Sequence, residues 1–234
     1  MTDERGFTRK DYVFFGLTDK SLHTFEAIQV PCANSLLDDA YVLVRILIEG
    51  IINGTYVSTM NDSVANDYAD FSDYREWIEF QDLAKVAPEI TSTVPTTDVE
   101  EMKRKHAALR ARYEKNANGD WSPENLFKRA AAIDMAVGHG LNLMRTLVNS
   151  PWRKACAWVH GTSASILSRV EESKSGVVIH RRYRAEEAAG VLFMSNMAIF
   201  ALLALADLRL GTKNKNDWRS LYDFWGGKPS APTT

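Results

Sequence analysis

The apolar residues between positions 36 and 52 constrain the fold most strongly. They recur at spacings of three and four residues: Leu36, Leu37, Ala40, Leu43, Val44, Leu47, Ile48, Ile51 and Ile52. This spacing places them on one face of an α-helix. The helix opens at Asn34 or Ser35 and runs to about Met60, and its long apolar face requires other elements to cover it. The pattern therefore predicts a helical bundle.

Other segments repeat the helical pattern. After an irregular stretch over 1–17, Thr18 or Asp19 caps a helix that Pro31 stops or restarts. Further helices are expected over 62–87, 98–115, 122–133, from there to about 148, and 184–210. Alternating runs of β-branched residues are nearly absent. We expect an all-α fold of about six to eight helices, as one domain over 1–225, and a disordered tail over 226–234.

The segment 188–206 permits two interpretations. Only Ser195 and Asn196 are clearly polar in it, and its length is close to the ~20 residues that span a bilayer. Three arginines precede it, as positive charges often flank membrane spans. Two glutamates adjoin it, however, and the other helices are amphipathic, which favours a buried central helix. We expect a central apolar C-terminal helix and no membrane, with a membrane-associated protein as the open alternative.

The charge balance limits the partners. Lys and Arg total 28 against 30 for Asp and Glu, so no broad basic surface for nucleic acid is predicted, while a local site that touches a few phosphates stays open. Cys32 and Cys156 lie far apart among apolar neighbours, which is typical of buried thiols in a reducing compartment. The N-terminal residues are too polar for a secretory signal. We expect a cytoplasmic protein.

Common cofactor and metal motifs are missing from the sequence. None of the five histidines has Glu or Asp three residues before it, as helical di-iron sites require. There is also no glycine-rich phosphate loop and no cysteine cluster of zinc-binding spacing. We therefore predict neither a cofactor nor a metal.

The segment 150–169 contains the most suggestive polar pair. Ser150 is suited to cap a helix and Pro151 to its first position. Arg153 and His160 are seven residues apart, which is about two helical turns, so they share one face beside Gly161. An imidazole moves protons near neutral pH, and a guanidinium binds phosphate oxygens. Together they supply the minimum for metal-free RNA cleavage.

The helix over 34–60 offers two possible partners for this pair. Glu49 is placed to orient His160 or Arg153, and Arg45 to add a phosphate contact. The alternative is that Arg45 and Glu49 form an ordinary i, i+4 pair or a buried polar tie. The sequence leaves both interpretations open.

These residues also carry a family resemblance over about residues 36–167. The matching motifs, in order, are Arg45-Ile-Leu-Ile-Glu49, Asp120-Trp-Ser122, Trp152-Arg153 and Val159-His160-Gly161. They resemble a family of bacterial helical proteins catalogued as a domain of unknown function. The order is in turn similar to HEPN-like domains, whose bundles hold an Arg, four to six residues, and then a His on a late helix.

The HEPN resemblance implies a metal-independent endoribonuclease of a toxin or phage-defence type, acting as a homodimer. Arg153 and His160 then take the motif positions as phosphate stabiliser and acid/base, and Glu49 that of the polar residue on the earlier helix. The residue after the motif Arg is often small and polar in that family, and here it is Lys154. The alternative is a non-catalytic interaction or regulatory module, with a protein partner, in which these residues and Arg45 form a buried polar network.

Overall fold

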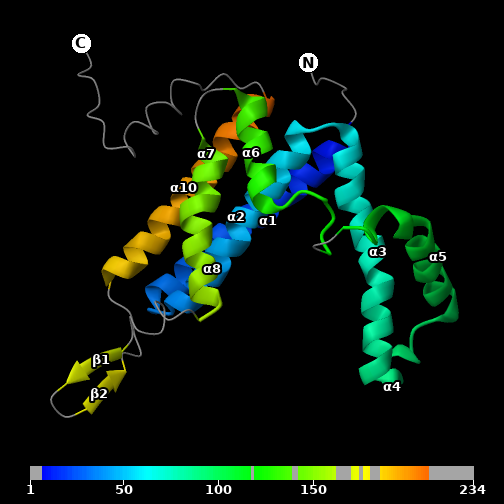
Figure 1. The fold of residues 1–234 in the computed structure, drawn as a ribbon, viewed down its shortest axis with the longest axis horizontal. Helices are drawn as coiled ribbons and strands as arrows, with labels where there is room; N and C mark the ends of the chain where they lie inside the picture. The colour runs from blue at the N-terminus through cyan, green and yellow to red at the C-terminus, as the bar shows by residue number, and fades with distance from the viewer. Residues whose placement is uncertain are drawn as a thin grey trace. The chain divides into compact units, whose positions relative to one another are not determined.

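The computed structural model describes residues 7–116, 119–138, 142–161, 170–173, 176–179 and 185–210, and most of these are helical (Figure 1). The elements are α1 (Arg9–Ala33), α2 (Leu37–Thr59), α3 (Asp62–Val86), α4 (Pro88–Thr91), α5 (Thr96–Tyr113), α6 (Leu126–Val137), α7 (Leu143–Leu147), a π-helical turn (Val148–Trp152), α8 (Arg153–Val159), β1 (Val170–Ser173), β2 (Gly176–Ile179) and α10 (Ala185–Leu210). The strands form a small antiparallel hairpin. The prediction of an all-α fold is confirmed. Among the described residues, this hairpin is the β structure that accompanies the helices.

The chain splits into two compact units. The first comprises Met1–Ser21 and Ile52–Ser150, and the second Leu22–Ile51 and Pro151–Thr234. Both units therefore include residues of α1 and α2. The single domain over 1–225 stays a prediction, and the tail over 226–234 lies outside the described residues.

In the first unit, α5 runs antiparallel to α3 (Figure 1). The rings of Tyr74 and His106 stack with their centroids 4.7 Å apart. The Tyr113 hydroxyl donates to the carbonyl of Asp67 at 2.7 Å, and Phe71 packs edge-on against the Tyr113 ring. The aromatic residues of α3 thus hold α5 in place, as aromatic clusters in cores commonly do.

A buried arginine joins further segments of the first unit. Arg129 of α6 is 3% exposed. Its guanidinium donates to the side chains of Asn53 and Asp120 and, at 2.9 Å, to the carbonyl of Glu124. It also lies 5.0 Å from the centre of the Trp121 ring. Because a buried cation is costly unless it is paired and hydrogen-bonded, these contacts fix how α2, α6 and the loop before α6 meet.

The second unit has an apolar core to which α2 and α10 contribute. Six residues of the predicted face are fully buried in this part of α2: Leu37, Ala40, Val44, Leu47, Ile48 and Ile51, whereas Leu36, just before the helix, is 51% exposed. The buried residues of α10 lie mostly at spacings of three and four residues: Val191, Met194, Ser195, Ala198, Ile199, Ala201, Leu202 and Asp207. The Ser195 hydroxyl donates to the carbonyl of Val191 at 2.8 Å, so its polar group is satisfied within the helix.

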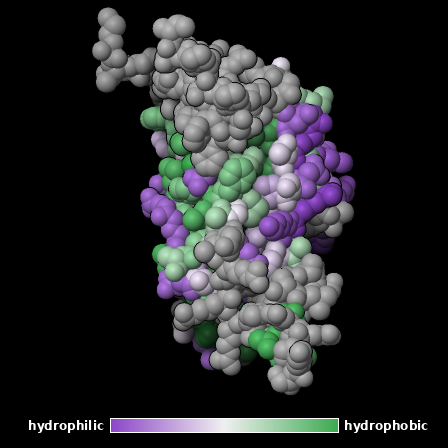
Figure 2. All heavy atoms as spheres, turned by 90° about the vertical axis from the view of Figure 1, so that its left-hand side faces the viewer, coloured by the Kyte–Doolittle hydropathy of each residue, from purple (hydrophilic) through white to green (hydrophobic). Residues whose placement is uncertain are grey.

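Two described helices, α2 and α10, are long and apolar enough to cross a membrane. The candidate windows lie within Leu37–Thr59 and Glu187–Asp207, and 56% and 39% of them are buried. Length and composition are weak evidence, because core helices of soluble proteins pass the same test. Figure 2 faces the side of Figure 1 on which α10 lies, and hydrophobic and hydrophilic surfaces lie side by side there. The membrane-associated alternative therefore rests on composition alone.

The first helix differs from its expected boundaries. α1 begins at Arg9, well before the expected start, because Thr8 and Asp11 cap it reciprocally. The Asp11 N–H donates to Thr8 Oγ1 at 3.2 Å, and the Thr8 N–H donates to Asp11 Oδ2 at 3.0 Å. Pro31 lies inside the last turn and does not stop the helix at once. The expectation that residues 9–17 are irregular is wrong because this short-range capping pair was overlooked.

The Arg129 network leads to a stability prediction. Arg129→Met leaves the side chains of Asn53 and Asp120 without their buried donor, so the free energy of unfolding should fall by about 3 kcal/mol. The matched control is Lys128→Met, at an exposed neighbour whose ion pair with Glu124 should contribute less than about 1 kcal/mol. Urea unfolding followed by circular dichroism measures both values. Equal losses for the two variants would contradict the assignment.

Candidate functional site

The segment before the predicted Arg–His pair folds differently from the expectation. α7 continues into the π-helical turn Val148–Trp152, which leads directly into α8. Pro151 lies within this turn and has no N–H, which disfavours regular α-helical hydrogen bonding there. The prediction that Ser150 caps a new helix is therefore wrong. Residues 162–169 of the same segment lie outside the described part of the chain.

A polar cluster in the second unit joins α2 to the π-helical turn. Glu49 Oε1 accepts from Arg45 Nε at 2.9 Å and from the indole Nε1 of Trp152, also at 2.9 Å. The guanidinium carbon of Arg45 lies 5.9 Å from the centre of the Trp152 ring. The side chains of Arg45 and Glu49 are 31% and 35% exposed. One carboxylate oxygen thus fixes both an arginine and a tryptophan near the surface.

The Glu49 carboxylate affects the pKa of Arg45. The hydrogen bond from Arg45 to Glu49 raises the pKa of the guanidinium above its ordinary value, and partial burial opposes this rise. Arginine is protonated throughout the physiological range in any case. The effect of Glu49 is therefore one of orientation: it holds the guanidinium through Nε and leaves the Nη atoms available for another partner.

His160 is that other partner, at the end of α8. Its Nε2 lies 3.4 Å from Arg45 Nη1, and its side chain is exposed. The His160 N–H donates to the carbonyl of Cys156 at 3.0 Å, and Gly161 follows with φ +58, a left-handed conformation that favours glycine. A guanidinium has only donors, so a hydrogen bond here requires Nε2 to accept and places the imidazole proton on Nδ1.

Four candidate site residues were selected from the sequence, and the structure describes the contacts of each of them differently. Arg45, Glu49 and His160 belong to one set of contacts. Arg153 is exposed at the first residue of α8, and the guanidinium of Arg45 lies within reach of the imidazole. From the sequence, Trp152 received no role at the site and was named only within the Trp152-Arg153 motif of the family resemblance. Its indole N–H was the available signal, because a half-buried tryptophan commonly donates to a polar partner.

Aromatic and basic side chains extend the cluster along α2 and α8. The rings of Tyr41 and Trp158 stack with their centroids 4.8 Å apart and their planes 12° apart. The ammonium of Lys154 lies 5.7 Å from the centre of the Tyr41 ring. The Tyr41 ring packs against the inner face of Trp158. Because Tyr41 is only 2% exposed, a ligand cannot contact its ring. Lys154 and Arg153 add exposed positive charge to this surface.

The environment of the nearby Cys156 thiol disfavours the thiolate form. Burial raises the pKa of the Cys156 thiol, the charge of Arg45 opposes this rise and that of Glu49 adds to it. A thiol with a raised pKa stays protonated, and only the thiolate is reactive. No group of three or more potential ligands among the described residues could hold a metal ion. The chemistry available here is that of an imidazole beside a fixed guanidinium.

The fold and cluster define an all-helical protein with a surface arginine–glutamate–histidine site. The model of a protein family, described as a family of unknown function (DUF5677), matches residues 11–177. The chain belongs to this family, and the matched range includes Arg45, Glu49, Trp152 and His160. No curated protein and no solved structure matches the chain.

The contact between Glu49 and Trp152 leads to a second stability prediction. Glu49→Met and Trp152→Phe each remove one side of the hydrogen bond, so the double variant should be more stable than the sum of the single losses predicts, by about 1 kcal/mol. The cycle is measured by urea unfolding of the four proteins. Strict additivity would show that Glu49 does not hold the indole, and would contradict the described geometry.

Proposed function

We propose that the protein is a HEPN-like, metal-independent endoribonuclease of a toxin or phage-defence type. The observation that carries the proposal is the exposed imidazole of His160, whose Nε2 lies 3.4 Å from the guanidinium that Glu49 fixes. This contact supports a site in which His160 is the acid/base group and Arg45 a phosphate-binding group beside it. The HEPN resemblance adds a class of substrate, RNA, and a cytoplasmic homodimer as the working form.

The proposed reaction is attack by the RNA 2′-hydroxyl on the adjacent phosphorus. In the proposed step Arg45 Nη1 moves from Nε2 to a phosphoryl oxygen of the bound RNA, and the freed Nε2 takes the proton of the 2′-hydroxyl. A new bond forms between the 2′-oxygen and phosphorus, and the bond to the 5′-oxygen breaks. The 5′-oxygen leaves with a proton from solvent water, and the His160 imidazolium returns its proton to the hydroxide that remains. The products are a 2′,3′-cyclic phosphate and a 5′-hydroxyl, so no water is added and no metal is needed.

Two arginines have different parts in this proposal. Arg45 lies beside the imidazole and stabilises the negative charge that develops on the phosphoryl oxygens, since a pre-oriented cation acts more strongly than a mobile one. Arg153, the arginine that the sequence motif favours, is exposed on α8. It binds a phosphate of the same strand in the proposal, together with Lys154. Glu49 is a positioning residue and does not touch the substrate.

A second candidate function is a non-catalytic interaction or regulatory module. It is favoured by the two hydrogen bonds that Glu49 accepts. A carboxylate that connects α2 to the π-helical turn stabilises the fold whether or not the protein is an enzyme. In that case the cluster sets the alignment of the helices, and the exposed surface binds a protein partner.

The nuclease proposal predicts a specific pattern of activity losses. His160→Ala should lower the rate of cleavage about 100-fold or more, because positioned general acid–base groups contribute at least that much. Arg45→Gln should lower it to a similar extent. Cleavage of a labelled single-stranded RNA is measured in the presence of EDTA, with the 2′-deoxy form of the same oligonucleotide as the substrate that lacks the attacking hydroxyl.

The matched control is His23→Ala, at an exposed histidine of α1 outside the cluster, which should leave the rate unchanged. Circular dichroism establishes that all variants retain their helices. Absence of cleavage by the wild-type protein, or equal rates for His160→Ala and the wild type, would refute the nuclease. Loss of stability in Glu49→Met without any RNA cleavage by the wild type would favour the interaction module.

A further inference from the structure

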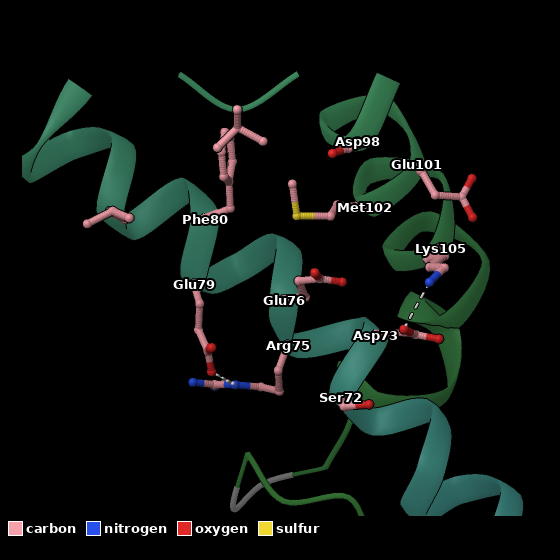
Figure 3. A pocket seen from close by; sticks show the side chains of 12 residues that line it. Ser72, Asp73, Arg75, Glu76, Glu79, Phe80, Asp98, Glu101, Met102 and Lys105 are labelled. Carbon is pink, nitrogen blue, oxygen red and sulfur yellow. Dashed lines mark hydrogen bonds and ion pairs between the residues drawn. The ribbon is translucent and has the colours of Figure 1, made fainter. Parts of the chain in front are cut away.

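A groove opens between α3 and α5 in the first unit, apart from the Glu49 cluster. Its volume is about 930 Å³. Figure 3 shows that residues of both helices line it, with the Met102 side chain of α5 reaching across the opening toward α3. Ser72 lies near one end.

The interior of the groove is apolar. Its apolar lining consists of Phe80, Leu83, Val94 and Met102. Leu83 is 40% exposed, so it can contact a molecule that occupies the groove. Methionine adapts its shape to different partners and is common at binding surfaces. These side chains offer a hydrophobic contact that the described chain does not use.

The rim of the groove is acidic. Five carboxylates line it against two cations: Asp73, Glu76, Glu79, Asp98 and Glu101 against Arg75 and Lys105. Each cation is engaged by a carboxylate of the same rim, Lys105 by Asp73 at 3.2 Å and Arg75 by Glu79 at 3.3 Å. In Figure 3 the carboxylates of Glu76 and Asp98 point into the groove from its two walls. Glu101 is paired with Arg104 at 2.6 Å, so the negative charge that the rim presents to an occupant comes mainly from Glu76 and Asp98.

We propose that this groove binds a basic amphipathic helix of a protein partner. On both walls of the groove, apolar and acidic side chains lie within one helical turn of each other. A partner helix with an apolar strip flanked by lysines or arginines would therefore contact both kinds of side chain at the same time. The walls are helices whose backbone groups are already hydrogen-bonded, so recognition occurs through side chains, as in other helix-in-groove complexes. This surface does not depend on the proposed nuclease activity.

The test uses the full chain and a designed peptide. A fluorescein-labelled amphipathic helix of Leu and Lys, about five turns long, should bind the wild-type protein in fluorescence anisotropy, and its Kd should rise with ionic strength. A Leu and Glu peptide of equal length should bind at least tenfold more weakly. Tight binding of the Leu and Glu peptide, or no binding of the Leu and Lys peptide, would overturn the proposal.

Matched substitutions locate the binding surface. Leu83→Asp and Glu76→Lys, both in the groove, should each weaken binding about tenfold. Val86→Asp and Glu100→Lys are their controls, because Val86 is 80% exposed on the same helix and Glu100 is exposed on α5, both outside the groove lining. These two should change the Kd less than about twofold. Equal losses in groove and control variants would overturn the assignment.

Two further measurements distinguish helix binding from misfolding of a variant and from attraction by charge alone. Circular dichroism of each variant establishes that α3 and α5 are intact, and Glu76→Lys decides the outcome if Leu83→Asp fails to fold. Spermine, a polycation without an apolar face, is added as a competitor. Displacement of the peptide by an equal concentration of spermine would show that charge alone is recognised, and would overturn the proposal of a helix.

Discussion

The Glu49 carboxylate is the interaction on which the candidate site depends. Its Oε1 accepts from both Arg45 and Trp152, so one atom fixes the position of a helix of the core against the π-helical turn. Once the guanidinium is held through Nε, its Nη1 meets the imidazole of His160. Without this carboxylate, Arg45 would be a mobile surface arginine and His160 a solvated histidine at a helix end. The constraint converts two ordinary residues into a positioned pair.

The first unit uses a buried cation in a comparable way. Arg129 binds three oxygen atoms from two segments, α2 and the loop before α6, and these hydrogen bonds offset the cost of burying its charge. In both units a charged side chain on a helix therefore sets the alignment that apolar packing alone leaves loosely determined.

The sequence predicts the helical elements well where the signal is periodic. The apolar face of α2 follows from its three- and four-residue spacing, whereas the almost uniformly apolar segment of α10 predicts a helix without indicating which face is buried. The start of α1 was missed because its signal is a single capping pair, and the π-helical turn because a Ser-Pro dipeptide normally opens a helix. Spacing along one helix favoured Arg153 as the partner of His160. The contact with Arg45 joins positions 115 residues apart, which no local pattern reports.

The tautomer of His160 tests the central geometry most directly. Because arginine only donates, the contact with Arg45 requires Nε2 of the imidazole to accept and Nδ1 to carry the proton. Long-range ¹H–¹⁵N correlation spectra, assigned with His160→Ala, distinguish the two tautomers in the neutral ring. We predict the Nδ1–H form in the wild-type protein and a loss of this preference in both Arg45→Gln and Glu49→Met. A ring protonated at Nε2 in the wild type, or a spectrum that neither variant changes, would contradict the positioned Arg45–His160 pair.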